Sequence, residues 1–284
     1  MTAETASRAA RLAGVPPEPG VGKPDPILVA DGVTKTFGGL RAVQVGRLEV
    51  QRGAITALIG PNGAGKTTLF NLLTGFDRAD SGSWSFEGRP LAGLPAYRVA
   101  RAGMVRTFQL TKSLTLLTVL ENLKLGSRQQ PGERFFTALV HPLWRAREES
   151  IEQLADEMLA RFRLDHMRDE FAGTLSGGQR KLLELARALM VQPTMLMLDE
   201  PTAGVNPALT QSLLGHIQQL RDEGMTILFV EHDMDVVMGI SDWVVCMAEG
   251  RVIAEGPPAS IGSNHAVIDA YLGAHHGRRA GREA

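Results

Sequence analysis

A glycine-rich segment in the first quarter of the chain has the spacing of a loop that binds phosphate groups. Its glycines let the backbone turn so that N–H groups can surround the β- and γ-phosphates of a nucleotide. The pattern G-x-x-x-x-G-K-[ST] belongs between a strand and a helix, and the positive N-terminal end of that helix adds to the attraction. The residues expected to line the nucleotide are Gly60, Pro61, Asn62, Gly63, Ala64, Gly65, Lys66, Thr67 and Thr68.

Two side chains of this segment define its chemistry. Lys66 can place a positive charge on the phosphates, and Thr67 can offer its hydroxyl to Mg²⁺. A tight turn without a ligand is the alternative, but an apolar run at 54–59 and a helical pattern at 66–73 supply the strand and helix that the loop needs. The spacing G-x-G-x-x-G is absent, so no dinucleotide is predicted.

A pair of carboxylates follows a second apolar run, at 195–198. Asp199 and Glu200 come directly after this run, which has the length of a buried strand. Asp199 suits a water-mediated hold on Mg²⁺, and Glu200 is placed to orient or deprotonate an attacking water. Beside a phosphate loop, this pair predicts hydrolysis of a nucleotide.

The sequence L-S-G-G-Q at 175–179 precedes a helical pattern at 180–190. Alone, it would predict only a helix cap. Together with the loop and the carboxylates, it resembles the nucleotide-binding subunits of ATP-binding cassette (ABC) transporters, whose motifs stand in this order; the resemblance covers about Ile27 to Leu272. It implies that nucleotide is also contacted by Ser176, Gly177, Gly178 and Gln179, with Ser176 and Gly178 at the γ-phosphate.

The same resemblance implies further site residues. Phe37 would stack on adenine, with a place in the core as the alternative. Gln109 would meet Mg²⁺ or the attacking water and sense the membrane partner, and His232 would act as the switch histidine near the γ-phosphate. Asn206 stands where relatives commonly have aspartate, so a part in hydrolysis does not follow for it. The implied catalytic residues are Glu200, His232, Gln109 and Lys66, and the implied metal ligands are Thr67, Gln109 and Asp199.

Ligands and partners are implied in the same way. The nucleotide is ATP with Mg²⁺. Because the signature segment closes the site of the opposite subunit in this family, a second ABC ATPase subunit is implied, as a homodimer or a related heterodimer partner. Integral membrane permease subunits are the other partners, and an extracytoplasmic solute-binding protein acts indirectly. The chain is expected at the cytoplasmic face of the cell membrane, as a peripheral protein.

Three short segments resemble one group within this family. Residues 231–242, 203–207 and 270–273 are similar to the branched-chain amino acid importer ATPases of the LivG type. Urea or short amides are the alternative cargo, because their importers use similar subunits. Export of lipid or drug, and a soluble non-transport ABC ATPase, are further alternatives. A phosphate-loop kinase or GTPase would lack the segment at 175–179.

The elements that position these residues follow from hydrophobic periodicity. Short β-like segments at 27–50 predict antiparallel strands. Apolar runs at 54–59, 194–198 and 226–230 alternate with helical patterns, which predicts a parallel sheet covered on both faces, with ligands at the carboxyl ends of its strands. The predicted fold class is α/β: a P-loop NTPase cassette with, as the resemblance implies, a RecA-like parallel-sheet core, an N-terminal antiparallel β subdomain and a mainly helical subdomain at about 106–191.

Composition excludes several other classes. The 284 residues carry 30 basic and 31 acidic side chains, and the net charge of −1 offers no field that would hold nucleic acid. Charges interrupt every apolar run before the roughly 18 residues of a membrane-spanning helix, and a single cysteine excludes a disulfide framework. We expect a flexible leader over residues 1–26, an ABC ATPase domain over 27–273 and a flexible tail over 274–284.

Overall fold

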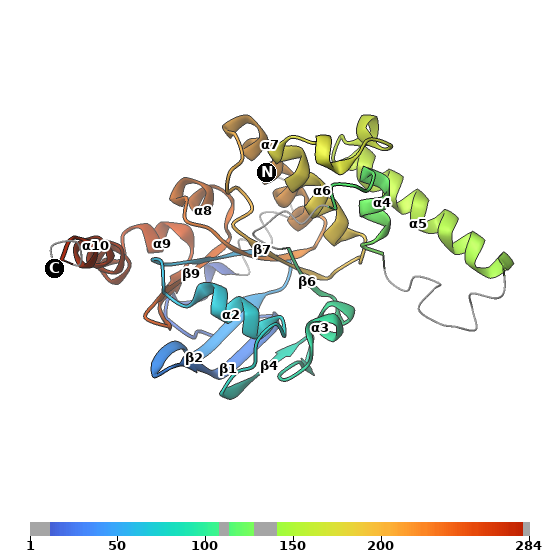
Figure 1. Ribbon diagram of the computed structural model, residues 1–284. Helices are drawn as coiled ribbons and strands as arrows, with labels where there is room; N and C mark the ends of the chain where they lie inside the picture. Colours follow the sequence, from blue (N-terminus) through green and yellow to red (C-terminus); the bar gives the residue numbers. More distant parts are fainter. Residues whose placement is uncertain (1–11, 108–113, 128–140, 281–284) are drawn as a thin grey trace.

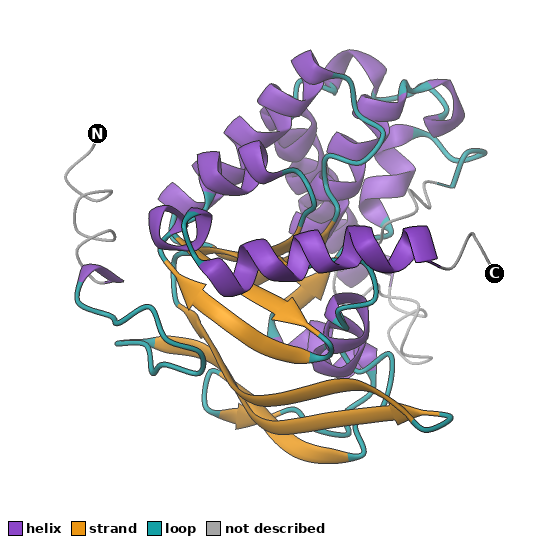
Figure 2. Ribbon diagram, turned by 90° about the vertical axis from the view of Figure 1, so that its left-hand side faces the viewer, coloured by secondary structure: helices purple, strands orange, loops and turns teal. Residues whose placement is uncertain are grey.

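The structure of the chain is a computed structural model that describes residues 12–107, 114–127 and 141–280 (Figure 1). Its described strands form two sheets, one antiparallel and one mainly parallel. The long helices lie above both sets of strands in Figure 2. These layers agree with the predicted α/β cassette.

The antiparallel sheet is built from the N-terminal third of the chain. Its strand order is β2-β1-β4-β5, and Val33 of β1 pairs with Val45 of β2, both buried. One face of the sheet packs on the core while exposed polar residues occupy much of the other, as is usual for antiparallel sheets. The strands are β1 (Pro26–Phe37), β2 (Leu40–Gln51), β4 (Ser81–Phe86) and β5 (Arg89–Pro90).

The parallel sheet carries the candidate site. Its order is β10-β9-β3-β8-β7-β6, with only β10 antiparallel to its neighbour. Every residue of β3, β7 and β8 is buried, which explains why these strands are continuous apolar runs without alternation. The strands are β3 (Ile55–Ile59), β6 (Met104–Arg106), β7 (Met195–Asp199), β8 (Thr226–Val230), β9 (Trp243–Ala248) and β10 (Arg251–Gly256).

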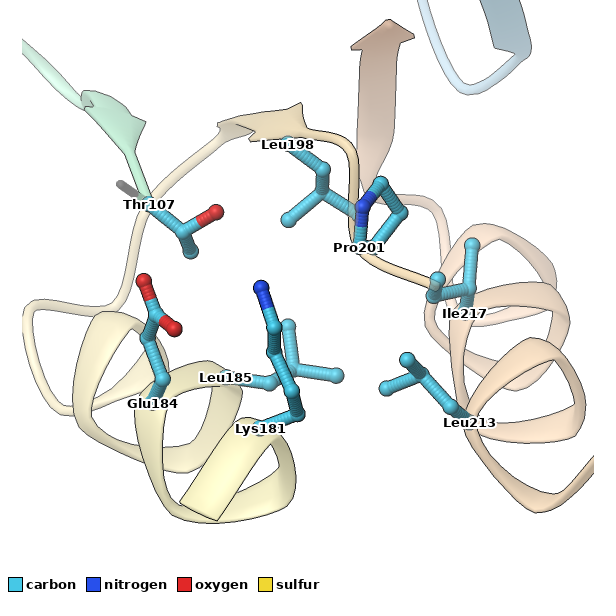
Figure 3. Close-up of a pocket in the computed structure, with 8 residues that line it drawn as sticks. All are labelled: Thr107, Lys181, Glu184, Leu185, Leu198, Pro201, Leu213 and Ile217. Carbon is cyan, nitrogen blue, oxygen red and sulfur yellow. The ribbon is translucent and has the colours of Figure 1, made fainter. Parts of the chain in front are cut away.

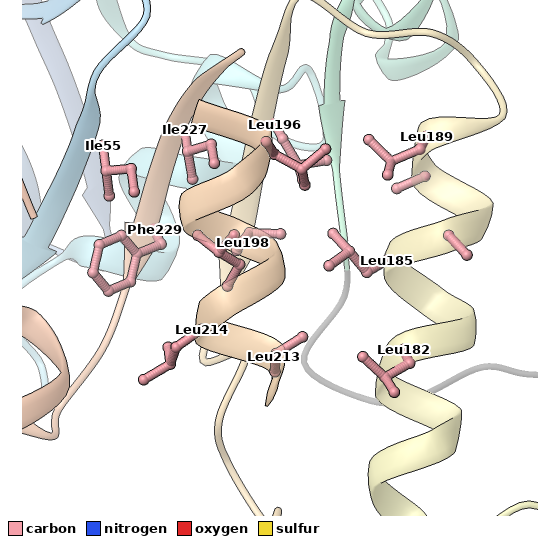
Figure 4. Close-up of a cluster of buried hydrophobic side chains, with 14 of the residues drawn as sticks. Ile55, Leu182, Leu185, Leu189, Leu196, Leu198, Leu213, Leu214, Ile227 and Phe229 are labelled. Atoms are coloured by element: carbon pink, nitrogen blue, oxygen red, sulfur yellow. The ribbon is translucent and has the colours of Figure 1, made fainter. Parts of the chain in front are cut away.

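Helices cover this sheet and close the core. Leu182, Leu185 and Leu189 lie on one face of α6, toward Leu196 of β7 and Leu213 of α7 (Figure 4). This spacing of three and four residues is the helical period that the sequence shows. The helices that cover the sheet are α2 (Lys66–Leu73), α3 (Ala96–Ala102), α6 (Gly177–Leu189), α7 (Pro207–Asp222), α8 (Met234–Ile240), α9 (Pro258–Gly262) and α10 (His265–Ala280).

The predicted helical lobe is present and begins after β6. Residues 104–106 belong to the parallel sheet, so the lobe starts slightly later than the predicted boundary at 106. Thr118 caps α4 in a capping box with Glu121, in which each side chain accepts a hydrogen bond from the backbone N–H of the other. The lobe contains α4 (Val119–Lys124), α5 (His141–Arg161), the 3₁₀ turns η2 (Asp165–Met167) and η3 (Ala172–Thr174), and α6.

Residues 12–25, the described part of the predicted leader, pack against the fold. Lys23 and Glu255 form an ion pair of 2.9 Å, and each of their side chains is 1% exposed. Glu255 also accepts hydrogen bonds from the backbone N–H of Gly20 and the indole of Trp243, and Leu12 is buried in the core. The prediction of a flexible leader therefore does not hold for these residues.

The C-terminal boundary also differs from the prediction. Helix α10 continues to Ala280, past residue 274 where the tail was expected to begin. Among the described residues, no helix has both the length and the apolar character to cross a membrane.

Candidate functional site

The phosphate loop leaves β3 at Gly60 and enters α2 at Lys66. Gly60 has a φ of 146°, and a Cβ there would collide with the carbonyl oxygen of Met247. Gly65 has a φ of 96°, and a Cβ there would collide with the carbonyl oxygen of Ala42. Both positions therefore require glycine for conformation and for space, as the motif predicted.

Lys66 lies at the base of this loop with its side chain folded back. Its Nζ donates hydrogen bonds to the carbonyl oxygens of Gly60 at 2.7 Å and Pro61 at 3.0 Å. Burial lowers the pKa of Lys66, and the negative charges of Glu200 and Asp199 oppose this shift. The loop therefore holds a positive charge close to both carboxylates of the predicted site.

Asp199 is the last residue of β7, and it is paired with a residue that the sequence analysis did not single out. Arg106, at the end of β6, donates from Nη2 to Asp199 Oδ2 and from Nη1 to Asn71 Oδ1, both at 2.6 Å. The two side chains of the ion pair are only 6% and 3% exposed. A charged residue at the end of a short apolar strand was the available signal for Arg106.

Glu200 and His232 meet beyond the ends of β7 and β8. Glu200 Oε1 and His232 Nε2 are 2.8 Å apart, with donor and acceptor set by the imidazole tautomer. Glu200 has a φ of 49°, in the left-handed backbone region that residues other than glycine rarely adopt. Such conformations cluster at functional sites because the surrounding structure must hold them. Here the backbone N–H of Glu200 donates to the carbonyl of Val230 at 3.0 Å.

Glu231 connects the segments that follow β7 and β8, next to the Glu200–His232 pair. It is buried, and its carboxylate accepts hydrogen bonds from the backbone N–H of Thr202 and of His232, each at 3.0 Å, and from the Thr202 hydroxyl. The sequence indicated a polar residue at this strand end but no role. The structure places it as the link between the segment after Glu200 and the segment that carries His232.

The signature segment forms the N-terminal end of α6, in a part of the molecule away from α2 (Figure 1). Ser176 is the N-cap and forms a capping box with Gln179. A Cβ on Gly178 would collide with Leu209, so glycine lets α6 lie against α7. Ser176 and Gly177 are exposed. The segment therefore presents its cap to solvent, and the structure does not bring it onto the phosphate loop of its own chain.

The remaining predicted site residues are exposed or half-buried, or they lie outside the described residues. Phe37 is at the end of β1 with 49% of its surface exposed, so it is not a core residue, and Lys35 Nζ lies 5.0 Å from its ring centre. Thr67 is exposed and Thr68 half-buried at the start of α2. Gln109 lies outside the described residues. Asn206 is the N-cap of α7, accepting from the backbone N–H of Leu209 at 2.9 Å, a contact that aspartate could also make.

A small cavity lies behind the Asp199–Glu200 corner. Figure 3 shows Lys181 and Glu184 of α6 pointing into it, toward Thr107 and Pro201. Its volume of about 20 Å³ is enough for about one water molecule. Both charged side chains are buried. Helix α6 therefore places polar groups beside Thr107, the residue that follows β6.

A larger groove, of about 430 Å³, lies at the other end of the sheet. Thr194, which precedes β7, and Thr226, the first residue of β8, line this groove together with Arg161 and Glu223. Ligands of parallel sheets bind at the carboxyl ends of the strands. This groove is therefore separate from the phosphate loop and the carboxylates.

Comparison with known proteins agrees with this geometry. Residues 43–203 match the ABC transporter family, and residues 251–277 match the branched-chain amino acid ATP-binding cassette transporter family. The high-affinity branched-chain amino acid transport ATP-binding protein BraF of Pseudomonas aeruginosa is 42% identical over 250 residues, which cover 87% of this chain and 98% of BraF. LivG of Escherichia coli, which has the same description, is 42% identical over 251 residues, covering 87% and 98%.

A solved structure shows the same fold. The ADP conformation of an ATP-binding cassette of an ABC transporter superposes with a TM-score of 0.77 and 38% identity, covering 87% of this chain and 99% of that one. These matches extend from the antiparallel sheet to the C-terminal helices. The chain therefore belongs to the ATP-hydrolysing, ATP-binding subunits of ABC transporters, in the group that contains the branched-chain amino acid transport proteins.

Proposed function

We propose that this chain powers the uptake of branched-chain amino acids, as the ATPase subunit of an importer at the cytoplasmic face of the cell membrane. The observation that carries this proposal is the presence of two matches in one chain, a general transporter cassette and a C-terminal segment of the branched-chain group. The named relatives are transport proteins for these amino acids. The C-terminal match favours this cargo over urea, short amides, lipid or drug.

Hydrolysis of ATP depends on two side chains that follow strands and on the lysine at the start of α2. Glu200 orients the attacking water or accepts a proton from it, because its carboxylate follows β7 and is partly exposed to solvent. His232 holds this carboxylate through the contact of 2.8 Å. Lys66 leaves its two loop carbonyls to bind the phosphates, a step that its position at the base of the loop allows.

Mg²⁺ fits the oxygen groups at this site. Asp199, Thr67 and Gln109 would hold it, directly or through water, since carboxylate, hydroxyl and amide oxygens are the ligands that this ion prefers. When bound, Mg²⁺ neutralises phosphate charge that develops during hydrolysis. Asp199 is kept at the end of β7 by its ion pair with Arg106, which fixes the carboxylate before any ligand arrives.

A second ABC ATPase subunit completes the nucleotide site. The cap at Ser176 and Gly177 is exposed, so the N-terminal end of α6 can approach the phosphates held by another subunit. Phe37 is exposed in the same way and would stack on the adenine. The partner is a second copy of this chain or a related cassette.

Permease subunits receive the motion of the paired cassettes. Their cytoplasmic helices dock on the helical lobe, and Gln109, which lies outside the described residues, is the side chain expected to sense them. An extracytoplasmic solute-binding protein delivers the amino acid to the permeases. In this scheme, the cassette determines the energy supply and the other subunits determine the solute.

Uptake of labelled leucine, urea and acetamide tests the proposed cargo. Cells with the wild-type chain should accumulate leucine, whereas cells without the chain, or with Glu200→Gln, should not. Glu18→Gln, which removes an exposed carboxylate of the N-terminal segment outside the helical lobe, is the matched control and should keep leucine uptake. Leucine uptake that is independent of the chain, or dependence of urea or acetamide uptake alone, would contradict the proposal.

A further inference from the structure

The hydroxyl of Tyr271, on α10, lies against the first residue of the phosphate loop. The backbone N–H of Gly60 donates a hydrogen bond to Tyr271 Oη over 2.9 Å, although the two residues are 211 positions apart. Gly60 directly follows β3. The contact therefore joins the C-terminal helix to the point where the loop leaves the sheet.

Gly60 is held through both of its backbone polar groups. Its N–H is bonded to Tyr271, and its carbonyl accepts from Lys66 Nζ at 2.7 Å. The carbonyl of Met247 occupies the space beside its Cα, so the peptide has little room to turn. The hydrogen bond to Tyr271 therefore fixes Gly60, whose carbonyl accepts a hydrogen bond from Lys66.

The surroundings of Tyr271 suit this contact. Its ring is half-buried against the core cluster that contains Cys246, and Val267 on the same helix is buried, which anchors α10. Burial raises the pKa of Tyr271 to about 12, so the hydroxyl is neutral at physiological pH. A neutral hydroxyl accepts the N–H bond and keeps its own proton.

We propose that Tyr271 is a positioning residue of the nucleotide site, and that the docked helix α10 holds the phosphate loop in the conformation that receives ATP. This inference rests on the proposed ATP-binding role of the loop. The general transporter match ends at residue 203, whereas Tyr271 lies within the branched-chain match at 251–277. The contact therefore joins the segment that matches the narrower group to the loop that lies within the general transporter match.

The chain contains two tyrosines, which provides a matched control. Tyr271→Phe keeps the ring but leaves the Gly60 N–H without its acceptor, and we expect the Kd for MgATP to rise about tenfold. The kcat at saturating ATP should change less than about twofold, because the groups around the attacking water are untouched. Tyr97→Phe, on an α3 side chain that is 55% exposed, should keep the wild-type Kd.

A role in folding alone would lower the thermal midpoint of Tyr271→Phe and leave the Kd unchanged, and an unchanged Kd overturns the proposal. An independent readout uses the full chain with only Tyr97→Phe, labelled with 3-fluorotyrosine, so that a single ¹⁹F resonance reports Tyr271. We expect this resonance to shift as ADP is added and to saturate with the Kd measured by calorimetry. A resonance that does not respond to bound ADP overturns the proposal. A wild-type chain that binds no nucleotide overturns the proposed function as well.

Discussion

Glu200 and His232 are 32 positions apart in the chain, and their side chains meet at 2.8 Å because β7 and β8 are neighbours in the sheet. The register pairs Asp199 with Val230, so the residues that follow these two leave the sheet side by side. The buried carboxylate of Glu231 then fixes both strand ends. The pairing of two strands therefore brings together the two side chains that we propose to act on the attacking water.

Substitution of this pair should show that the two residues act as a unit. Glu200→Gln should lower kcat by about 100-fold or more, the contribution expected of a general base, and retain ATP binding. His232→Ala should also lower kcat, and the double variant should be little worse than Glu200→Gln alone, because groups that act together are not additive. Steady-state ATPase assays measure this. Additive losses in the double variant would show that the contact has no part in catalysis.

Removal of the lysine should affect binding more directly. Lys66→Ala removes the charge at the base of the loop and should raise the Kd for ATP at least about tenfold, a loss typical of a charge-assisted contact. Calorimetric titration measures the Kd. Lys124→Ala is the control, since that ammonium lies on α4 and pairs with Glu148 and Glu152 at the surface. Equal affinities of Lys66→Ala and the wild type would refute the loop assignment.

The ion pair of Arg106 and Asp199 should contribute to stability, because both side chains are almost completely buried. Arg106→Met leaves the carboxylate without its partner and should lower the free energy of unfolding by about 3–5 kcal/mol. Urea unfolding of the nucleotide-free chain measures the change. Arg168→Met, which removes a surface network with Glu152, Asp156 and Asp169, should cost about 1 kcal/mol or less. A smaller loss in Arg106→Met than in Arg168→Met would contradict this ranking.

Cys246 should be unreactive in the folded chain. Burial raises the pKa of its thiol to about 12, and it is the single cysteine, so alkylation has one possible target. Iodoacetamide at pH 8 should leave the native chain unmodified and modify it completely in urea, as mass spectrometry would show. Stoichiometric alkylation of the native chain would mean that the thiol is accessible.

The same shift predicts a dependence of stability on pH. The thiol ionises at a lower pH in the unfolded chain, near 9.0, than in the folded chain, so unfolding releases a proton between these values. Its contribution to stability is therefore complete below pH 9 and decreases as pH rises toward 12, by up to about 1.4 kcal/mol per pH unit. Cys246→Ala should show a shallower decrease in the free energy of unfolding over this range. Equal slopes in both proteins would contradict the assignment. Tyr271 contributes to the decrease in both proteins.

Local sequence patterns predicted much of the fold. The helix at 66–73 and the strand at 226–230 have the predicted bounds. A glycine-rich loop marks the start of the helix, and the strand is a continuous apolar run. The apolar run at 195–198 predicted a strand that ends in Asp199 and Glu200, whereas His232 was implied only by the family resemblance. Their side-chain contacts depend on which strands are neighbours, and that order is not encoded in any short segment.

Contacts between distant segments were missed. Lys23 and Glu255, 232 positions apart, form a buried ion pair that anchors part of the predicted leader to the rest of the fold. Tyr271 and Gly60 meet in the same way. Neither contact leaves a periodic pattern, because each depends on a single side chain. The predicted leader is rich in Ala, Pro and Gly, and this composition did not indicate the charged side chain that anchors residues 12–25.

We expect ATP to be held between the Gly60 loop of one copy of this chain and the Ser176 cap of a second copy. Moving the subunits from mainly apart to mainly paired requires about 5.5 kcal/mol of preferential nucleotide binding, which only contacts across the interface can provide. Both Asn62 and Ser176 are exposed, so a cysteine at either position can reach a neighbour.

Disulfide cross-linking between chains carrying Asn62→Cys and chains carrying Ser176→Cys, both with Glu200→Gln, measures whether these two segments face each other. With MgATP, the mixture should form a cross-linked dimer in oxidising conditions, and without nucleotide the dimer should be nearly absent. A mixture in which Glu157→Cys replaces Asn62→Cys should give no dimer. If the Asn62–Ser176 mixture binds ATP but cross-links no more than it does without nucleotide, the two segments do not face each other and the account is wrong.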